Sequence, residues 1–142
     1  AGLRVGIATA EGIAIALGLP LIGLSTMEAV AHATGRTSVT VIHPAGRGVY
    51  AVQDFENGAP VGPRRGERAE EIAWSACAGQ DAGDHGGLEI SPGTRCEAAL
   101  RALLPRFAAR TTDAGNVDAV YLREPNITVP RPRQPLLTPL NS

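Results

Sequence analysis

Apolar residues in the first 17 positions repeat with the period of an α-helix and cover almost its whole circumference. One face carries a row with four-three spacing, made of Leu3, Ile7, Ala10, Ala14 and Leu17. A second apolar row consists of Val5, Ala8, Gly12 and Ile15. Only Arg4 and Glu11, which lie one heptad apart, share a polar edge. The pattern predicts a helix that begins with no lead-in and ends at Gly18.

Such a helix needs cover on nearly every side. A surface helix of a globular domain normally keeps a wide polar face toward water. This helix has none, so we expect its own sheet to cover one side and a second partner to cover another. Small residues also gather on one side of the helix wheel, namely Gly2, Gly6, Thr9 and Ala16. Because glycine costs a helix about 1 kcal/mol relative to alanine, it is tolerated where another backbone comes close.

The next part of the chain alternates between strand and helix patterns. Ser25 and Glu28 have the spacing of a capping box, which marks the start of a helix that ends before Gly35. Asn57-Gly58 is a hairpin signal, so residues 37–62 are expected to form an antiparallel meander. The expected elements are a buried strand over 19–24, a helix over 25–34, a strand over 37–42, a turn over 43–48 and a strand over 49–55.

The second half of the chain gives weaker signals. Pro105 falls inside the last expected helix and should kink or shorten it. Five prolines without periodicity after Glu124 predict an extended or disordered tail. The expected elements are a helix over 66–78, a glycine-rich loop over 79–93, a helix over 94–109 and a short strand over 117–122. The alternation predicts an α/β or α+β class.

Composition excludes several kinds of function. The net charge of −1 gives no basic footprint for nucleic acid, and 4% aromatic residues give no platform for stacking bases. Cys77 and Cys96 make neither a disulfide framework nor a metal motif, which favours two free thiols in a cytoplasmic protein without a signal peptide. A membrane span over 5–24 is disfavoured by Glu11 near its middle and by Pro20.

The histidine and aspartate residues of the chain do not have the spacing of known catalytic or metal-binding motifs. His32, His43 and His85 have no metal-pair spacing; His32 fits a polar helix position and His43 a turn. The loop with Asp81 and Asp84 lacks calcium-loop spacing. We therefore predict no catalytic residues, no metal site and no cofactor. The chain is expected to be an interaction module, or part of an enzyme whose chemistry lies elsewhere.

Three segments resemble the TsaB (YeaZ) family. Residues 2–31 resemble it closely, with Gly2-Leu-Arg-Val-Gly6 opening the helix and Pro20-Leu-Ile-Gly-Leu-Ser-Thr-Met-Glu-Ala29 after it. Residues 43–50 stand at a turn and strand of the family, although His43 replaces the usual aspartate. Residues 119–125 resemble the closing Tyr-Leu-Arg signature. The first-lobe strands with their Asp-Thr motif are missing.

The resemblance implies an α/β fold of the actin/Hsp70/sugar-kinase-like (ribonuclease H-like) kind, with the first lobe incomplete. Residues 1–35 would end the N-terminal lobe, 36–123 would form the C-terminal lobe, and 124–142 would be a proline-rich tail. TsaB proteins are non-catalytic scaffolds and activators of the complex that makes threonylcarbamoyladenosine at position 37 of tRNA. The implied partners are a TsaD-like enzyme and a TsaE-like ATPase, with a homodimer possible and tRNA reached only through the complex.

In that family the first helix packs against TsaD or a second TsaB. The implied partner interface is Leu3, Arg4, Ile7, Ala10, Glu11, Ala14 and Leu17. Two other readings stay open at this point: a glycoprotease-like metal-dependent hydrolase, and an ATP-binding lobe inferred from the fold alone.

Overall fold

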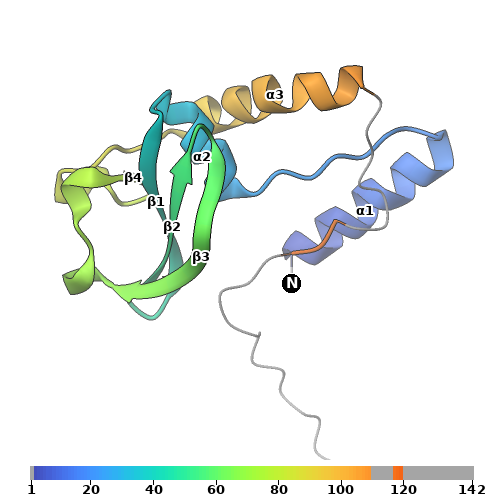
Figure 1. Cartoon of the computed structure of the whole chain (residues 1–142). Coiled ribbons are helices and arrows are strands. Elements are labelled where there is room, and N and C mark those ends of the chain that lie inside the picture. Colours follow the sequence, from blue (N-terminus) through green and yellow to red (C-terminus); the bar gives the residue numbers. More distant parts are fainter. Residues whose placement is uncertain (1, 110–116, 120–142) are drawn as a thin grey trace, which may run out of the picture.

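Residues 2–109 and 117–119 are described in a computed structural model of the chain. A long linker separates a first helix, α1 (Gly2–Leu17), from a sheet with two further helices, α2 (Thr26–Thr34) and α3 (Pro92–Ala108) (Figure 1). The sheet has four strands in the order β3-β2-β1-β4. Their bounds are β1 (Ser38–Gly46), β2 (Val49–Glu56), β3 (Ala59–Arg68) and β4 (Cys77–Gly79).

The meander predicted over 37–62 is confirmed and is longer than expected. β1 pairs antiparallel with β2 from Ser38↔Glu56 to Gly46↔Val49, and β2 pairs antiparallel with β3. Both hairpins turn through two residues with positive φ: Arg47 (57°) with Gly48 (70°), and Asn57 (51°) with Gly58 (79°). This backbone matches the right-handed twist of the strands, which is why Asn-Gly was a reliable signal.

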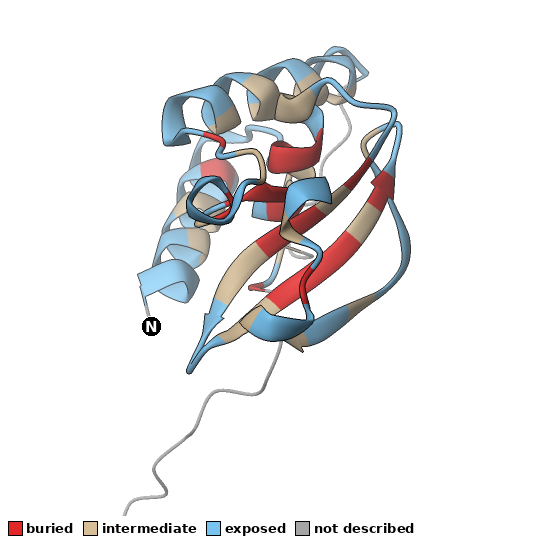
Figure 2. Ribbon diagram, turned by 90° about the vertical axis from the view of Figure 1, so that its left-hand side faces the viewer, coloured by how far each residue is buried: buried red, intermediate tan, exposed pale blue. Residues whose placement is uncertain are grey.

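Apolar residues are buried on both faces of the sheet. On one face α2 packs over β1, and the cluster there is Met27, Val30, Ala31, Val39, Val41, Ala51, Phe55, Ala78 and Ile90. On the other face the cluster is Ile42, Val52, Ile72, Cys77 and Ala82. We call the first the helix side and the second the open side. Figure 2 shows the buried residues gathered in the central strands and α2, while α1 is mostly exposed.

Three elements predicted before residue 79 are wrong. Residues 19–24 form no strand; they are a stretched linker between α1 and α2 (Figure 1). The turn predicted over 43–48 is mostly strand, so His43 lies in β1 rather than in a turn. The helix predicted over 66–78 is replaced by the end of β3, two short 3₁₀ helices (Ala69–Glu71 and Trp74–Ala76) and β4.

Strand pairing explains the lost helix. Gly66 lies opposite Ala51 in the ladder with β2, and the pairing continues to Arg68↔Val49. Ile72 is buried on the open side, and the Trp74 indole Nε1 donates to the Ala69 carbonyl at 2.9 Å. The local acidic and alanine-rich pattern favours a helix, but pairing with β2 and burial of Ile72 outweigh that preference.

The last predicted helix is confirmed as α3. Ser91 caps it, accepting a hydrogen bond from the Thr94 amide at 3.2 Å. The helix continues beyond Pro105 to Ala108, so the proline does not shorten it. Val117–Ala119, the described part of the strand predicted over 117–122, is not in a strand. Residues 120–122 and the tail predicted from 124 onward lie outside the described residues, and the predicted domain boundaries stay a prediction.

The capping box at the start of α2 is confirmed in full and gives a first testable prediction. Ser25 Oγ accepts from the Glu28 amide at 3.1 Å, and Glu28 Oε2 accepts from the Ser25 amide at 3.0 Å. Because α2 covers the helix side of the sheet, Ser25→Ala should lower the free energy of unfolding by about 1 kcal/mol. Urea unfolding followed by circular dichroism measures this loss.

Ser75→Ala is the matched control, since Ser75 is exposed and caps no helix. We expect it to change the free energy of unfolding by less than about 0.5 kcal/mol. Equal losses in the two variants would contradict a stabilising role for the cap.

Candidate protein–protein interface

The exposed surface of α1 is apolar. Large aliphatic side chains on this helix and just after it are 53% to 74% exposed, and they are Leu3, Val5, Ile13, Ile15, Leu17 and Leu19. Figure 1 shows α1 standing away from the sheet, joined to it by the linker. Apolar patches rimmed by polar residues are typical of interaction sites, whereas single exposed aliphatic residues are ordinary. The grouping of six such residues on one short segment therefore makes α1 the candidate interface.

The structure divides the predicted interface residues into two groups. Ala14 is buried, and Ile7, Ala10 and Glu11 are half-buried, so this part of the first row faces the chain itself. Leu3, Arg4 and Leu17 are exposed. The assignment of the seven residues to a partner stays a prediction, and the three exposed ones are those that a partner reaches directly.

Three strongly exposed aliphatic residues of α1 belong to positions that we did not assign to the interface. Val5 and Ile15 belong to the second apolar row, and Ile13 lies outside both rows. The periodicity showed both rows, but it gave no reason to choose between them. Burial of Ala14 distinguishes the two rows, because it shows that the chain itself covers the side of α1 on which the first row lies.

No contact within the described residues requires a glycine at positions 2, 6 or 12 of α1. A Cβ added at Gly2, Gly6 or Gly12 would meet no atom within 4 Å. Each glycine lowers helix stability by about 1 kcal/mol relative to alanine. Close approach of a second backbone is the usual reason for such glycines, and it agrees with the exposed apolar residues nearby.

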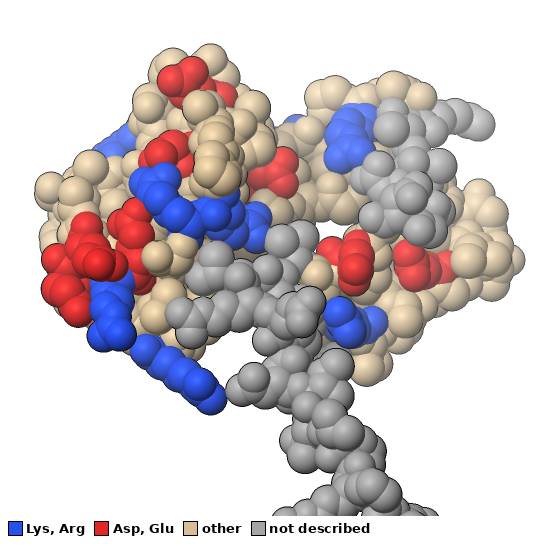
Figure 3. Space-filling model, turned by 60° about the horizontal axis from the view of Figure 1, so that its bottom comes forward, with Lys and Arg blue, Asp and Glu red and all other residues tan. Residues whose placement is uncertain are grey.

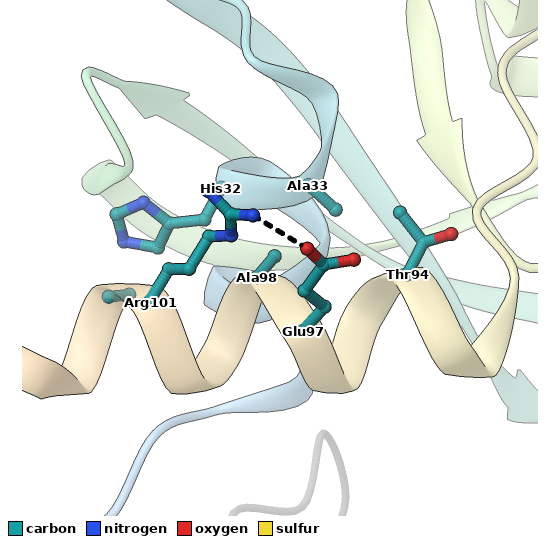
Figure 4. Close-up of a pocket in the computed structure, with 7 residues that line it drawn as sticks. His32, Ala33, Thr94, Glu97, Ala98 and Arg101 are labelled. Atoms are coloured by element: carbon teal, nitrogen blue, oxygen red, sulfur yellow. Dashed lines mark hydrogen bonds and ion pairs between the residues drawn. The ribbon is translucent and has the colours of Figure 1, made fainter.

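A groove lies between α2 and α3, apart from the surface of α1. Its volume is about 390 Å³, and the residues that line it are His32, Ala33, Thr94, Glu97, Ala98, Arg101 and Ala102. Figure 4 shows His32 and Arg101 at one end, with Arg101 Nη2 bonded to Glu97 Oε1 at 2.8 Å. This ion pair is one helical turn apart on the exposed surface, so it contributes a few tenths of a kcal/mol. His32 is exposed on α2, as its polar helix position predicted.

Aromatic residues on the open side form a packed group. The Trp74 and His85 rings stack with centroids 4.1 Å apart, and Tyr50 meets Trp74 edge-on at 5.2 Å. The Tyr50 hydroxyl donates to Asp81 Oδ2 at 3.4 Å. Burial, followed by the nearby Asp81 carboxylate, raises the pKa of Tyr50. These contacts hold the loop after β4 against the sheet, so Asp81 has a structural role.

Metal-binding and thiol groups are scattered in the structure. Over 2–109 and 117–119, no three His, Cys, Asp or Glu side chains come together as a metal site. Cys77 is buried and Cys96 is exposed on α3. Burial raises the pKa of the Cys77 thiol, so it is not a reactive thiolate at neutral pH. Within the same ranges, no helix is both long and apolar enough to cross a bilayer.

Comparisons with known proteins define first the fold and then the family. A crystal structure of an uncharacterised protein with similarity to peptidase YeaZ, from Pseudomonas aeruginosa, superposes on this chain with a TM-score of 0.62 at 19% identity. The matched region covers 86% of this chain and 68% of the other chain. A structure of YeaZ from the same organism gives 0.61 at 18%, covering 85% and 68%. The predicted α/β fold of the actin/ribonuclease H-like class is therefore confirmed.

The family follows from the sequence. Residues 1–78 match the model of the TsaD family, described as tRNA N6-adenosine threonylcarbamoyltransferase. The chain belongs to this family, and its fold is that of the YeaZ structures. Membership places it in the biosynthesis of threonylcarbamoyladenosine in tRNA. Among curated proteins, none is significantly similar to the chain in sequence.

His43 predicts a pH dependence of stability. Burial, followed by the charges of Arg95 and Arg64, lowers its pKa from the ordinary 6.5, while Asp81 opposes the shift. On acidification the unfolded chain therefore binds a proton at this position before the folded chain does. The free energy of unfolding consequently decreases as the pH is lowered below 6.5. His43→Gln, which cannot titrate, should lose less stability than the unmodified chain between about pH 7 and about pH 5.

Urea unfolding at the two pH values measures this difference. The other titrating groups are common to both proteins, so their contributions cancel in the comparison. Equal losses of stability in the two proteins would contradict the lowered pKa.

Proposed function

We propose that the chain is a non-catalytic scaffold and activator subunit of the complex that makes threonylcarbamoyladenosine at position 37 of tRNA. It acts by pairing with a TsaD-like enzyme through α1. The single observation that carries this proposal is the exposed apolar surface of α1. A TsaE-like ATPase is a further partner in the complex, and a second copy of the chain competes for the same surface. This assembly works in the cytoplasm.

Burial of this surface supplies enough free energy for a specific complex. Fully burying one large aliphatic side chain is worth about 1.5–3 kcal/mol. Val5, Ile13, Ile15 and Leu17 are each more than half exposed, so together they offer several such contributions. Association itself costs at least about 4 kcal/mol in lost freedom of motion. A few residues at the centre of the surface therefore decide whether the complex forms.

Pairing also explains how a subunit without catalytic groups activates another. A partner that binds only the folded form of α1 stabilises that form, and α1 in turn stabilises the partner's bound conformation by the same free energy. Recognition of tRNA belongs to the assembled complex in this proposal, because the chain has a net charge of −1 and so no excess of positive charge for the phosphate backbone.

Ile15→Glu tests the proposal. Ile15 is 74% exposed, so the substitution leaves the fold of the chain intact and places a charge in the middle of the apolar surface. Burying that charge without a partner is costly, and we expect the affinity for a co-expressed TsaD-like enzyme to fall by at least about tenfold. Affinity purification followed by size-exclusion chromatography measures the complex.

Val61→Glu is the matched control, because Val61 is 44% exposed on β3, away from α1. It should leave the complex unchanged. A substitution at Ala14 is less informative, since Ala14 is buried and a glutamate there disturbs the chain itself. If Ile15→Glu copurifies with the enzyme as well as the unmodified chain does, pairing through α1 is wrong.

A further inference from the structure

Exposed large apolar side chains gather on two helices of the described part of the chain. One group is the six residues on α1 and just after it, and the other lies on α3 and consists of Leu100, Leu104 and Phe107. Single exposed aliphatic residues, such as Val61 on β3, are ordinary. A group of them on one element is typical of a contact surface. Helix α3 therefore carries an exposed apolar face that the packing of the chain itself does not explain.

The three exposed residues of α3 form one stripe along the helix. Leu104 and Phe107 follow Leu100 by four and seven positions, so their side chains leave the helix in similar directions. A different side of α3 is half-buried and packs toward the rest of the chain, including α2; it consists of Arg95, Ala98, Ala99, Ala102, Leu103 and Arg106. The exposed residues thus point away from the packed side. We call Leu100, Leu104 and Phe107 the α3 stripe.

A polar rim borders the α3 stripe. Arg101 follows Leu100 in the sequence, and its Nη2 is paired with Glu97 Oε1 at 2.8 Å. Both side chains of this pair are strongly exposed, so their charges stay in water when the stripe is covered. Specific interfaces have an apolar centre surrounded by a polar rim. The surface of α3 has this composition.

The linker after α1 connects the α3 stripe with the apolar surface of α1. Arg106 Nη1 on α3 donates to the Gly23 carbonyl at 3.2 Å, which holds the linker against the C-terminal half of α3. Near α1, the Leu19 amide donates to the Ala14 carbonyl at 2.9 Å. Figure 1 shows the linker running between the two helices. Because Leu19 is itself exposed, apolar surface continues from α1 onto the linker that lies against α3.

α1 alone offers fewer residues than a specific interface usually engages. A standard interface takes about 20–30 residues from each partner. α1 has 16 residues, and the side that carries Ala14 faces the chain itself. A partner that pairs stably with α1 therefore has to contact a second element. Within the described ranges, α3 is the other element with several exposed large apolar side chains, and the linker from α1 leads to it.

The distribution of charge also favours the helices over the sheet as the apolar contact. The charged residues of α1 are Arg4 and Glu11. Figure 3 shows basic and acidic side chains crowded over the sheet portion and more widely spaced over the portion with α1. Covering charged groups with an apolar partner is costly unless each one finds a counterion. An apolar partner surface therefore fits the helices better than it fits the sheet portion.

We propose that the TsaD-like enzyme that pairs with α1 also covers the α3 stripe, so that α1, Leu19 and α3 form one apolar docking surface. This inference rests on the proposed function, because it adds a second contact to the same partner. The enzyme presents an aliphatic surface that lies across both helices. The Glu97–Arg101 pair stays at the edge of this contact.

Leu104→Glu tests the second contact, in affinity purification and size-exclusion chromatography with the co-expressed enzyme. Leu104 is 62% exposed, so the substitution leaves the fold intact and places a charge in the middle of the α3 stripe. We expect the affinity to fall by at least about tenfold, because the complex would bury an unpaired carboxylate. Far-UV circular dichroism confirms that the variant is folded.

Thr94→Glu is the matched control on the same helix. Thr94 lines the groove between α2 and α3 rather than the α3 stripe. Its amide is capped by Ser91, so a glutamate at this position completes a capping box and is tolerated by the helix. The control introduces the same charge as Leu104→Glu, and it should bind the enzyme as the unmodified chain does.

Hydrogen exchange of the unmodified chain follows the same contact without a substitution. Addition of the enzyme should slow exchange of the backbone amides of both α1 and α3, because covering a helix suppresses its local opening. The amides of β3, which lies outside the proposed surface, should exchange at the same rate with and without the enzyme.

The outcomes separate this inference from the proposed function. If Ile15→Glu weakens the complex while Leu104→Glu and the exchange of α3 show no effect, the enzyme docks on α1 alone and the second contact is wrong. If both variants bind as the unmodified chain does, pairing through α1 is wrong as well. Equal losses in Leu104→Glu and Thr94→Glu would also overturn the second contact. So would a loss of self-association in Leu104→Glu with unchanged enzyme binding, since a second copy would then cover the stripe.

Discussion

Burial of β1 on both of its faces is the constraint on which the rest of the structure depends. Val41 and Ile42 are adjacent and almost completely buried, yet their side chains point to opposite sides of the sheet. One side requires cover by α2, and the other requires the segment that carries Ile72. β4 completes the arrangement by pairing parallel to β1. A side chain at Gly79 would lie 2.1 Å from the Ile42 carbonyl oxygen, so this approach requires glycine.

The parts of the fold that could be predicted from the sequence are those decided by local chemistry. The hydroxyl and carboxylate of Ser25 and Glu28 cap α2 with their own neighbours, and Asn57-Gly58 has the backbone freedom that its turn requires. Predictions failed where a distant partner decides the outcome. The apolar pattern of residues 19–24 predicted a buried strand, but these residues are exposed or half-buried and lie in no strand. Residues 66–78 had helix propensity but lie partly in a ladder with β2. Propensity is a weak prior beside such contacts.

The same distinction applies to the candidate interface and to the charges of β3. The apolar rows of α1 were visible in the sequence, but which row faces outward depends on what covers Ala14, and that is a tertiary contact. Arg64 and Arg65 are chemically identical neighbours in the sequence. Their separation into one paired and one unpaired charge depends on which face of β3 each occupies beside Gln53 and Asp54. The sequence alone could not show which of the two arginines faces which side of the sheet. The reason is that the irregular pairing beside Gln53 shifts the register of β3.

The composition of α1 connects its stability to its proposed function. Glycines at positions 2, 6 and 12 weaken a helix of 16 residues, and a helix of this length is marginal in water without packing. Only Ala14 is buried on it, so the chain supplies little of the packing that α1 needs. In the proposed pairing, a partner that covers the apolar face stabilises the helix while it binds, and the glycines let the two backbones approach closely. Order in α1 and occupation of its surface are then one equilibrium, in which residues unfavourable to the free helix become favourable in the complex.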